Sequence, residues 1–188
     1  MSALISIIMT ATSEAGWLIY HEPKFTGKIL DIDTKQPIEG VVVVIVYKKE
    51  NMGLGGGNIS SVINVQETLT DKDGNFHFPS YRTLIQPFSW QIPSFFVIFK
   101  PGYASLGLVL KEYFKDGEPK EHEGSWPDQE LRKFKYRVRY PNIVELPKLT
   151  TREERLTAKR IYIEDYSAKE LPLLYKTLDE EGMALGVK

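Results

Sequence analysis

The sequence predicts a mainly β protein, an antiparallel β-sandwich followed by two C-terminal α-helices. Between residues 25 and 149, short apolar or alternating runs recur at near-regular spacing and are separated by turn-forming residues, a pattern typical of sandwich domains. Charge is also uneven, because residues 1–110 hold 8 Lys and Arg and 9 Asp and Glu, whereas residues 111–188 hold 16 of each. We therefore predict a sandwich domain over 16–149 and a solvated helical annex over 150–188.

The composition narrows the class of protein. The 188 residues are 42% hydrophobic and 26% charged, which is ordinary for a folded soluble chain, and no apolar run reaches the roughly 18 residues of a membrane span. The 24 basic and 25 acidic residues nearly balance, so we expect no nucleic-acid partner. Cysteine is absent, which excludes disulfides, thiol catalysis and Cys-ligated metals.

The N-terminus has features of an export signal. A short apolar run over residues 3–9 is followed by small residues ending in Ser13-Glu14-Ala15. This pattern predicts a signal peptide over 1–15, a mature chain beginning at Gly16, and a periplasmic or secreted location. No Lys or Arg precedes the apolar run, so a buried N-terminal strand or helix remains the alternative.

The first half of the domain reads as strands joined by turns. Val41–Tyr47 is an unbroken, mostly β-branched run, which favours a strand covered on both faces. We expect the C-terminal helices to cover its outer face. The other elements predicted before residue 79 are strands at 25–33, 62–70 and 76–78, turns at 34–37 and 71–75, and a glycine-rich loop at 52–58.

The second half begins with a long connection rich in prolines and aromatic residues, Pro79–Pro93. Apolar strand 95–99 and a turn at 101–103 follow, and residues 111–130 read as a polar loop. Residues 132–140 alternate between charged and apolar side chains, which predicts a half-solvated strand. A closing strand is expected at 143–149.

Two helices are predicted after residue 149. Thr150 with Glu153, and Ser167 with Glu170, have the spacing of capping boxes and should begin them. The second helix presents one apolar face, and Gly182 is its expected end. That face consists of Leu171, Leu174, Tyr175 and Leu178.

Four segments resemble the carboxypeptidase regulatory-like family over residues 25–104. They are Gly27–Asp31, Thr34–Val43 with its Pro-Ile-x-Gly piece, Thr68–Phe76 with its Thr-Asp-x-x-Gly-x-Phe piece, and Lys100–Tyr103. The resemblance implies a transthyretin-like β-sandwich and a non-catalytic accessory or binding role. With its two helices, the chain also resembles small secreted bacterial members of this group.

No catalytic or cofactor pattern emerges. Asp71, Asp73 and Asn75 lack the glycine and bidentate acid at EF-hand positions and fit a hairpin turn better. Gly53–Gly57 is not followed by the Lys and Ser or Thr of a phosphate-binding loop, and the three histidines have no metal-ligand spacing. The chain also lacks the C-terminal Tyr-Arg-Gly-Ser of the transthyretin-like hydroxyisourate hydrolases. We therefore expect no enzyme activity, no cofactor and no metal.

Two surfaces are candidates for contact with a partner. The first consists of Tyr81, Phe88 and Trp90 in the connection 79–93, because aromatic side chains dominate binding hot spots; alternatively, these rings cap the end of the core. The second is a row of cations that would meet a polyanion, or that forms a solvated edge paired with nearby acids. These cations are Lys133, Lys135, Arg137 and Arg139, and the acids are Glu121, Glu123, Asp128 and Glu130.

These observations favour a non-enzymatic secreted binding or assembly module whose partner is another protein or a cell-envelope glycan. The alternative is a structural component of the cell envelope held in a permanent complex.

Overall fold

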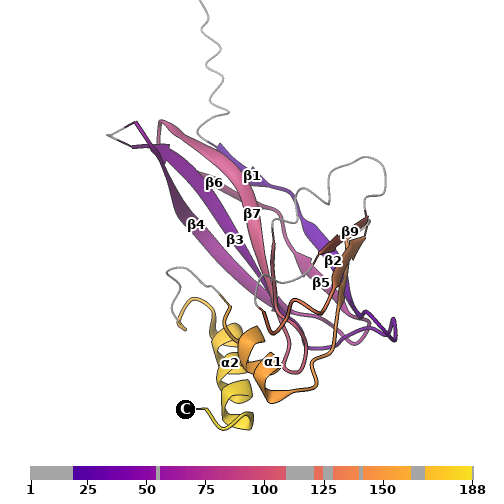
Figure 1. Cartoon of the computed structure of the whole chain (residues 1–188). Coiled ribbons are helices and arrows are strands. Elements are labelled where there is room, and N and C mark those ends of the chain that lie inside the picture. The colour runs from indigo at the N-terminus through magenta and orange to yellow at the C-terminus, as the bar shows by residue number, and fades with distance from the viewer. Residues whose placement is uncertain are drawn as a thin grey trace, which may run out of the picture.

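The structure is a computed structural model that describes residues 19–53, 56–108, 121–124, 129–139, 142–161 and 168–187. The predicted signal peptide and most of the predicted loop 111–130 lie outside these residues. In the described part the protein is mainly β, as predicted, with two helices near the C-terminus (Figure 1). No helix in this part is long and apolar enough to cross a membrane. The elements are β1 (Ile19–Glu22), β2 (Phe25–Asp31), β3 (Val42–Met52), β4 (Asn58–Leu69), β5 (Asn75–Phe78), β6 (Tyr81–Leu84), β7 (Ser89–Phe99), β8 (Leu106–Leu108), β9 (Glu121–Gly124), β10 (Tyr136–Arg139), β11 (Ile143–Leu146), α1 (Arg152–Ala158) and α2 (Pro172–Ala184).

The strands form three sheets. Their orders are β4-β3-β7-β8, β5-β2-β11-β10-β9 and β1-β6. The pairs are antiparallel except β2 with β11, which run parallel. The expectation of a wholly antiparallel arrangement is therefore wrong at this pair. β2 and β11 are far apart in sequence, so no hairpin fixes their relative direction.

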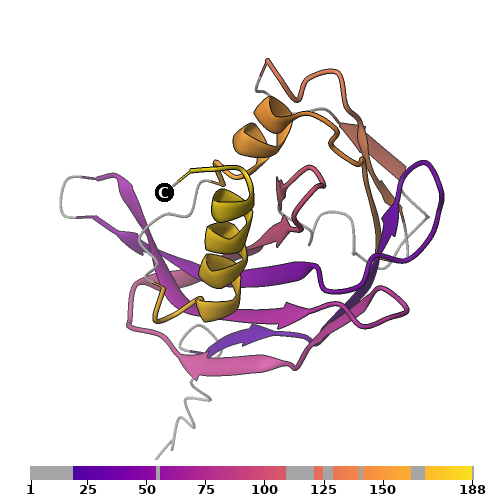
Figure 2. The same ribbon diagram turned by 90° about the horizontal axis from the view of Figure 1, so that it is seen from below.

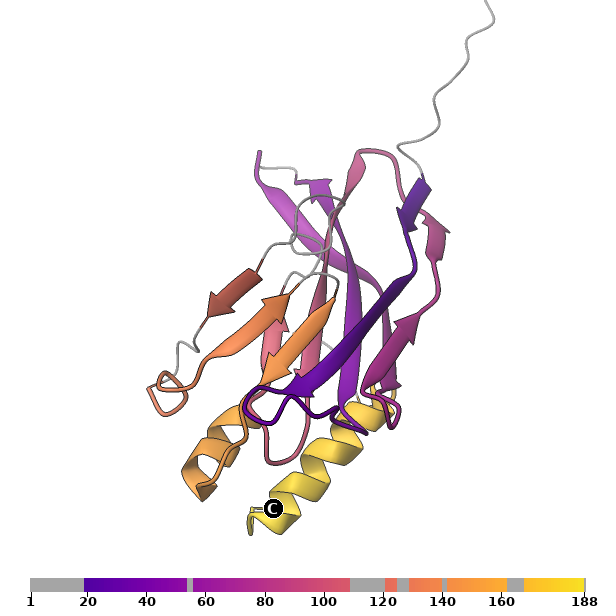
Figure 3. The same cartoon turned by 90° about the vertical axis from the view of Figure 1, so that its right-hand side faces the viewer.

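The four-stranded and five-stranded sheets share one core. Val43, Ile45 and Tyr47 of β3 point into it, and residues of β2, β5, β10 and β11 meet them from the other sheet. The Phe96 ring packs edge-to-face against Phe25, with ring centroids 5.3 Å apart. The two layers are visible side-on in Figure 3.

Helix α2 covers the outer face of the four-stranded sheet. Val42, Val44 and Val46 are buried there against Leu171 and Leu174, and Figure 2 shows α2 lying across β3 and β4. This confirms that the Val41–Tyr47 run is covered on both faces. Helix α1 behaves differently from the expectation, because its Ala158 joins the core between the sheets instead.

Helix α1 begins one residue later than predicted. Thr151 is the N-cap and Glu154 completes the capping box, whereas the sequence suggested Thr150 with Glu153. Both pairs have the same spacing, so the pattern alone is ambiguous. The buried Glu154 carboxylate accepts the Thr150 and Thr151 N–H groups, each at 3.0 Å, and it also pairs with Lys133. These contacts select the later start.

Helix α2 begins at Pro172, not near Ser167, which lies outside the described residues. Proline favours the first helical position, and it keeps the preceding Leu171 out of the helical region. The predicted apolar face is confirmed, since Leu171 and Leu174 are buried, with Tyr175 and Leu178 packed beside them.

Helix α2 also ends later than expected. Gly186, at φ +72°, is the left-handed residue that follows the helix. The Val187 N–H donates to Gly182 O at 2.8 Å and the Gly186 N–H to Met183 O at 3.1 Å, which is a Schellman ending. Gly182 lies inside the helix, where an added Cβ would come within 2.7 Å of Nζ of Lys159, the C-cap residue of α1.

The Pro79–Pro93 segment is mostly strand, contrary to the expectation of a long connection. It contains β6 and the first half of β7. Phe95 pairs with Val46 and Ile92 with Lys48, so Pro93 lies at an irregularity in the ladder. A proline has no N–H to donate and is tolerated in a strand at such a position. The strand predicted over residues 132–140 is shorter than expected, because β10 begins only at Tyr136 and a turn precedes it.

Candidate functional site

The three aromatic residues proposed to contact a partner have different surroundings. Tyr81 packs against the core and stacks on Tyr47, with ring centroids 4.5 Å apart. Its position fits the alternative role of a core cap. Phe88 and Trp90 belong to neither buried cluster, so only these two present contact area outside the core.

Phe88 is both strained and exposed. Its φ is +63°, in the left-handed region that side chains other than glycine, asparagine and aspartate rarely adopt. The positive φ belongs to the turn Gln86–Ser89, in which the Ser89 N–H donates to Gln86 O at 3.2 Å and the third position commonly takes this conformation. The side chain is 76% exposed, so core packing does not account for a phenylalanine at this position. A strained residue of this kind is a reason to look for function.

A further apolar side chain lies beside Phe88. The Met52 N–H donates to Phe88 O at 3.3 Å, and Met52 is 68% exposed. Met52 lies two residues after Glu50, the partner of Trp90 across β3 and β7, so it shares a sheet face with Trp90. We refer to Met52, Phe88 and Trp90 together as the end surface. Its residues lie at the end of β3 and at or just before the start of β7, close to the β3–β4 hairpin, which extends at the end of the molecule opposite the two helices (Figures 1 and 3).

Trp90 has a defined orientation within the end surface. It pairs with Glu50 across β3 and β7, and its indole Nε1–H donates to Glu50 Oε2 at 3.0 Å. The ring is 37% exposed. An aromatic ring held by one polar contact presents its exposed apolar area in a fixed orientation.

A buried network of side chains supports the strands below the end surface. The Glu22 carboxylate is fully buried and accepts from Ser94 Oγ at 2.9 Å and Gln91 Nε2 at 2.8 Å. Tyr20, beside it, is also buried, and burial raises the pKa of Tyr20 to about 12. The network joins β1 to β7, and the apolar-run reasoning applied to the sequence did not detect it.

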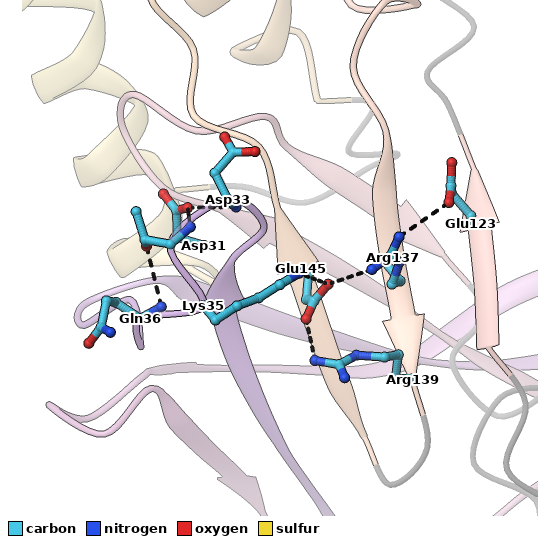
Figure 4. A network of polar contacts seen from close by, with 9 residues as sticks. Asp31, Asp33, Lys35, Gln36, Glu123, Arg137, Arg139 and Glu145 are labelled. Atoms are coloured by element: carbon cyan, nitrogen blue, oxygen red, sulfur yellow. Dashed lines mark hydrogen bonds and ion pairs between the residues drawn. The ribbon is translucent and has the colours of Figure 1, made fainter.

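The predicted row of cations meets carboxylates at every described position. Figure 4 shows Glu145 of β11 between Lys35 and two arginines. Lys35 Nζ is 2.9 Å from Glu145 Oε2, Arg137 Nη1 is 3.7 Å from the same oxygen, and Arg139 pairs with Oε1. The Glu145 side chain is fully buried, and a buried charge of this kind needs such partners.

The remaining two cations have separate partners. Lys135 Nζ and Arg137 Nη2 each lie 3.5 Å from the Glu123 carboxylate. Lys133 lies in the turn before β10 and pairs with Glu154 of α1. Lys135 directly precedes β10, so the expectation that all four cations share one strand face is wrong for Lys133 and Lys135. Glu123 was an expected partner, whereas Glu145 and Glu154 were missed. Pairing of the predicted strands would have placed Glu145 opposite Arg137.

Asp71, one of the residues that suggested a metal site, has a structural role. Asp71 Oδ1 accepts the N–H groups of Asp73 at 2.9 Å and Asn75 at 2.8 Å, so its carboxylate stabilises the turn. His21 and His77 lie in different sheets. Among the described residues, no group of three His, Asp or Glu side chains could hold a metal ion.

Comparisons with family models, curated proteins and solved structures found no match to this chain.

Proposed function

We propose that this chain is a non-enzymatic binding or assembly module that acts outside the cytoplasm and contacts a partner protein through the end surface. The observation that carries the proposal is Phe88, whose backbone strain and exposed ring both oppose folding stability. Selection for stability alone would favour asparagine or glycine at this position. The exposed Met52 beside it enlarges the apolar area available to a partner.

We also propose that the fold is of the transthyretin-like type of the carboxypeptidase regulatory-like family. The motif segments contact one another, which supports this assignment. The Thr70 hydroxyl donates to Ile38 O at 2.7 Å and accepts the Val41 N–H at 2.9 Å. Gly74, at φ +76°, would bring an added Cβ to 2.6 Å from Ile29 O, so the turn requires glycine.

The fourth segment joins the same region. The Tyr103 hydroxyl donates to Asp31 Oδ2 at 3.2 Å, and Lys100 Nζ donates to Gly40 O at 3.3 Å. Location outside the cytoplasm rests on the predicted signal peptide over residues 1–15.

An acidic cell-envelope glycan is the second candidate ligand. It would contact the Glu145 cluster, which we define as Lys35, Glu123, Lys135, Arg137, Arg139 and Glu145. In this cluster four cations meet two carboxylates, so positive charge is in excess. The Arg139 Nε atom is buried, and no group among the described residues accepts a hydrogen bond from it. The ion pairs neutralise much of the cation row, however, which favours the end surface.

Site-specific photocrosslinking tests the proposal. A photoreactive amino acid replaces Phe88 or Met52 in cells that produce the full chain, and His77, exposed on β5 in the other sheet, is the control position. We expect one discrete cross-linked partner from positions 88 and 52, weakened when Trp90→Ala is added. Equal yields from position 77, or none from the end surface, would contradict the proposal.

A further inference from the structure

Strand β4 forms one edge of the four-stranded sheet. It pairs with β3 over its whole length of 12 residues, and within the described residues no strand pairs with its other side. An edge of this length presents a row of backbone N–H and C=O groups that can bond to another strand.

Several of the usual protections of an exposed edge are missing from β4, although the strand does contain a bulge. Asn58–Leu69 contains no Lys, Arg or Pro, and Glu67 is its only charged residue. The Glu67 carboxylate is already engaged, since it accepts the Leu173 and Leu174 N–H groups at 2.6 and 3.0 Å. A groove of about 540 Å³, lined by Ser60–Val65 and Glu170, lies along this edge.

A bulge divides β4 into two halves. Tyr47 pairs with Asn64 and Lys48 with Val62, so Ile63 is one extra residue. Side chains alternate along a strand and an extra residue resets the alternation. Residues 58, 60 and 62 therefore share a sheet face with 65, 67 and 69.

Residues 58, 60, 62, 65, 67 and 69 also direct their backbone N–H and C=O groups to the free edge of β4. The Thr70 N–H donates to Val41 O at 3.0 Å, so Thr70 faces β3. Because facing alternates in an antiparallel pair, Leu69, Glu67 and Val65 face away from β3. Past the bulge, residues 62, 60 and 58 do so too.

We propose that two copies of this chain pair antiparallel through β4, about a twofold axis between Ile63 and Asn64. Each half of β4 then meets the other half of the second copy, so edge-facing residues oppose edge-facing residues. The pairs are Val62 with Val65, Ser60 with Glu67, and Asn58 with Leu69. No like charges face each other, and the contact is isologous and closed.

A second copy fits this edge better than an unrelated extended peptide. In the proposed register, residues 62 and 65, which are three positions apart, must both face the free edge. The bulge at Ile63 makes this possible in each copy, whereas edge-facing residues in a regular peptide are two positions apart. In that register, a strand without a bulge would pair residues whose backbone groups face the free edge with residues whose backbone groups face β3, and their side chains would lie on opposite faces of the sheet. The pairing uses the edge of β4 and is independent of the end surface.

Pair-specific cross-linking tests the register. The native chain has no cysteine, so Val62→Cys and Val65→Cys are prepared as separate full-length variants, mixed and treated with the short bridging reagent dibromobimane. We expect the mixture to form cross-linked dimer at least tenfold faster than either variant alone, since like positions would lie about 10 Å apart along the strand. A mixture of Val62→Cys with Leu69→Cys is the mismatched control. Equal rates in all mixtures would overturn the proposal.

Sedimentation of the full chain supplies the second measurement. We expect a dimer at micromolar concentration, with Kd raised at least tenfold by Val62→Lys, which places a cation on the edge. Leu84→Lys makes the same charge change on β6, where the side chain is 79% exposed, and it and Phe88→Asn should leave Kd unchanged. We expect a Kd on the order of 1 µM. A wild-type chain that is still monomeric at about 0.1 mM, roughly 100-fold above this Kd, would overturn the pairing. A chain that remains monomeric but binds an added β-strand peptide would do so as well.

Discussion

At the scale of a single residue, substitution of Phe88 tests whether its left-handed backbone lowers the stability of the fold. Asparagine tolerates the left-handed region better than phenylalanine, and the ring makes no core contact that its removal would lose. We expect Phe88→Asn to raise the free energy of unfolding by about 0.5–1 kcal/mol, measured by urea denaturation. Leu84→Asn, at an exposed strand position, should give no gain. A loss of more than about 1 kcal/mol for Phe88→Asn would show that the ring stabilises the fold.

Glu154 makes stability depend on acid pH. Burial by itself would raise its pKa, but the Lys133 ammonium and the Thr151 and Thr150 N–H groups outweigh burial and lower the pKa to about 2. A lowered pKa means that the ionised carboxylate stabilises the fold above its unfolded value of 4.5, and that this contribution is lost as pH falls toward 2.

Comparison with a neutral variant isolates this contribution. We expect Glu154→Gln to lose about 1–2 kcal/mol of unfolding free energy at pH 7. The difference from wild type should shrink between pH 4.5 and 2. Thermal melts across this range provide the measurement, and Glu153→Gln, outside the capping box, is the control. A difference that stays constant with pH would contradict the assigned role.

At the scale of elements, the sequence pattern predicted the features that depend on residues close together in the chain. The apolar period of α2 and the unbroken run in β3 were enough to predict both elements and their contact. The start of α2 was not predictable in this way, because its N-terminal acceptor is Glu67 of β4, more than 100 residues away in sequence. The parallel pairing of β2 with β11 likewise depends on long-range topology.

In the candidate site, too, the sequence pattern predicted some features but not those that depend on long-range contacts. Aromatic composition indicated the region of Phe88 and Trp90, but it could not distinguish them from Tyr81, because burial depends on the partner strand. Alternation placed Arg137 and Arg139 together, yet their shared partner Glu145 lies on the next strand. Left-handed backbone at Phe88 has no signature in an aromatic residue.

The Glu67 contact predicts a measurable effect on the docking of α2. Its carboxylate satisfies two N–H groups at the positive end of the helix, a contact worth about 1–2 kcal/mol. We expect Glu67→Gln to lower the unfolding free energy by about this amount and to increase hydrogen exchange in the first turn of α2. Glu180→Gln removes an exposed charge of α2 and should change stability by less than about 0.5 kcal/mol. Equal effects would contradict the capping role.

At the scale of the whole molecule, the helical end is held together by charge as well as packing. Arg155 of α1 binds the buried Glu181 of α2 with two contacts of 2.7 Å, and Arg152 Nε donates to Leu185 O at 2.9 Å. A bidentate pair of this kind fixes orientation as well as distance. The helices therefore dock together, α1 against the core and α2 against the outer face of the sheet.

This coupling predicts what removal of the helices does. Truncation after Leu149 exposes Val42, Val44, Val46, Val97 and Phe99 of the outer face. Each large apolar side chain left in water costs about 1.5–3 kcal/mol, so the total is comparable to the whole stability of a domain. We expect the truncated chain to aggregate or to melt far below the full chain. Truncation after Arg160, which removes α2 but keeps α1, should cause most of the same loss, because α2 supplies the cover. A soluble chain ending at Leu149 with an unchanged melting temperature would mean that the outer face does not depend on α2.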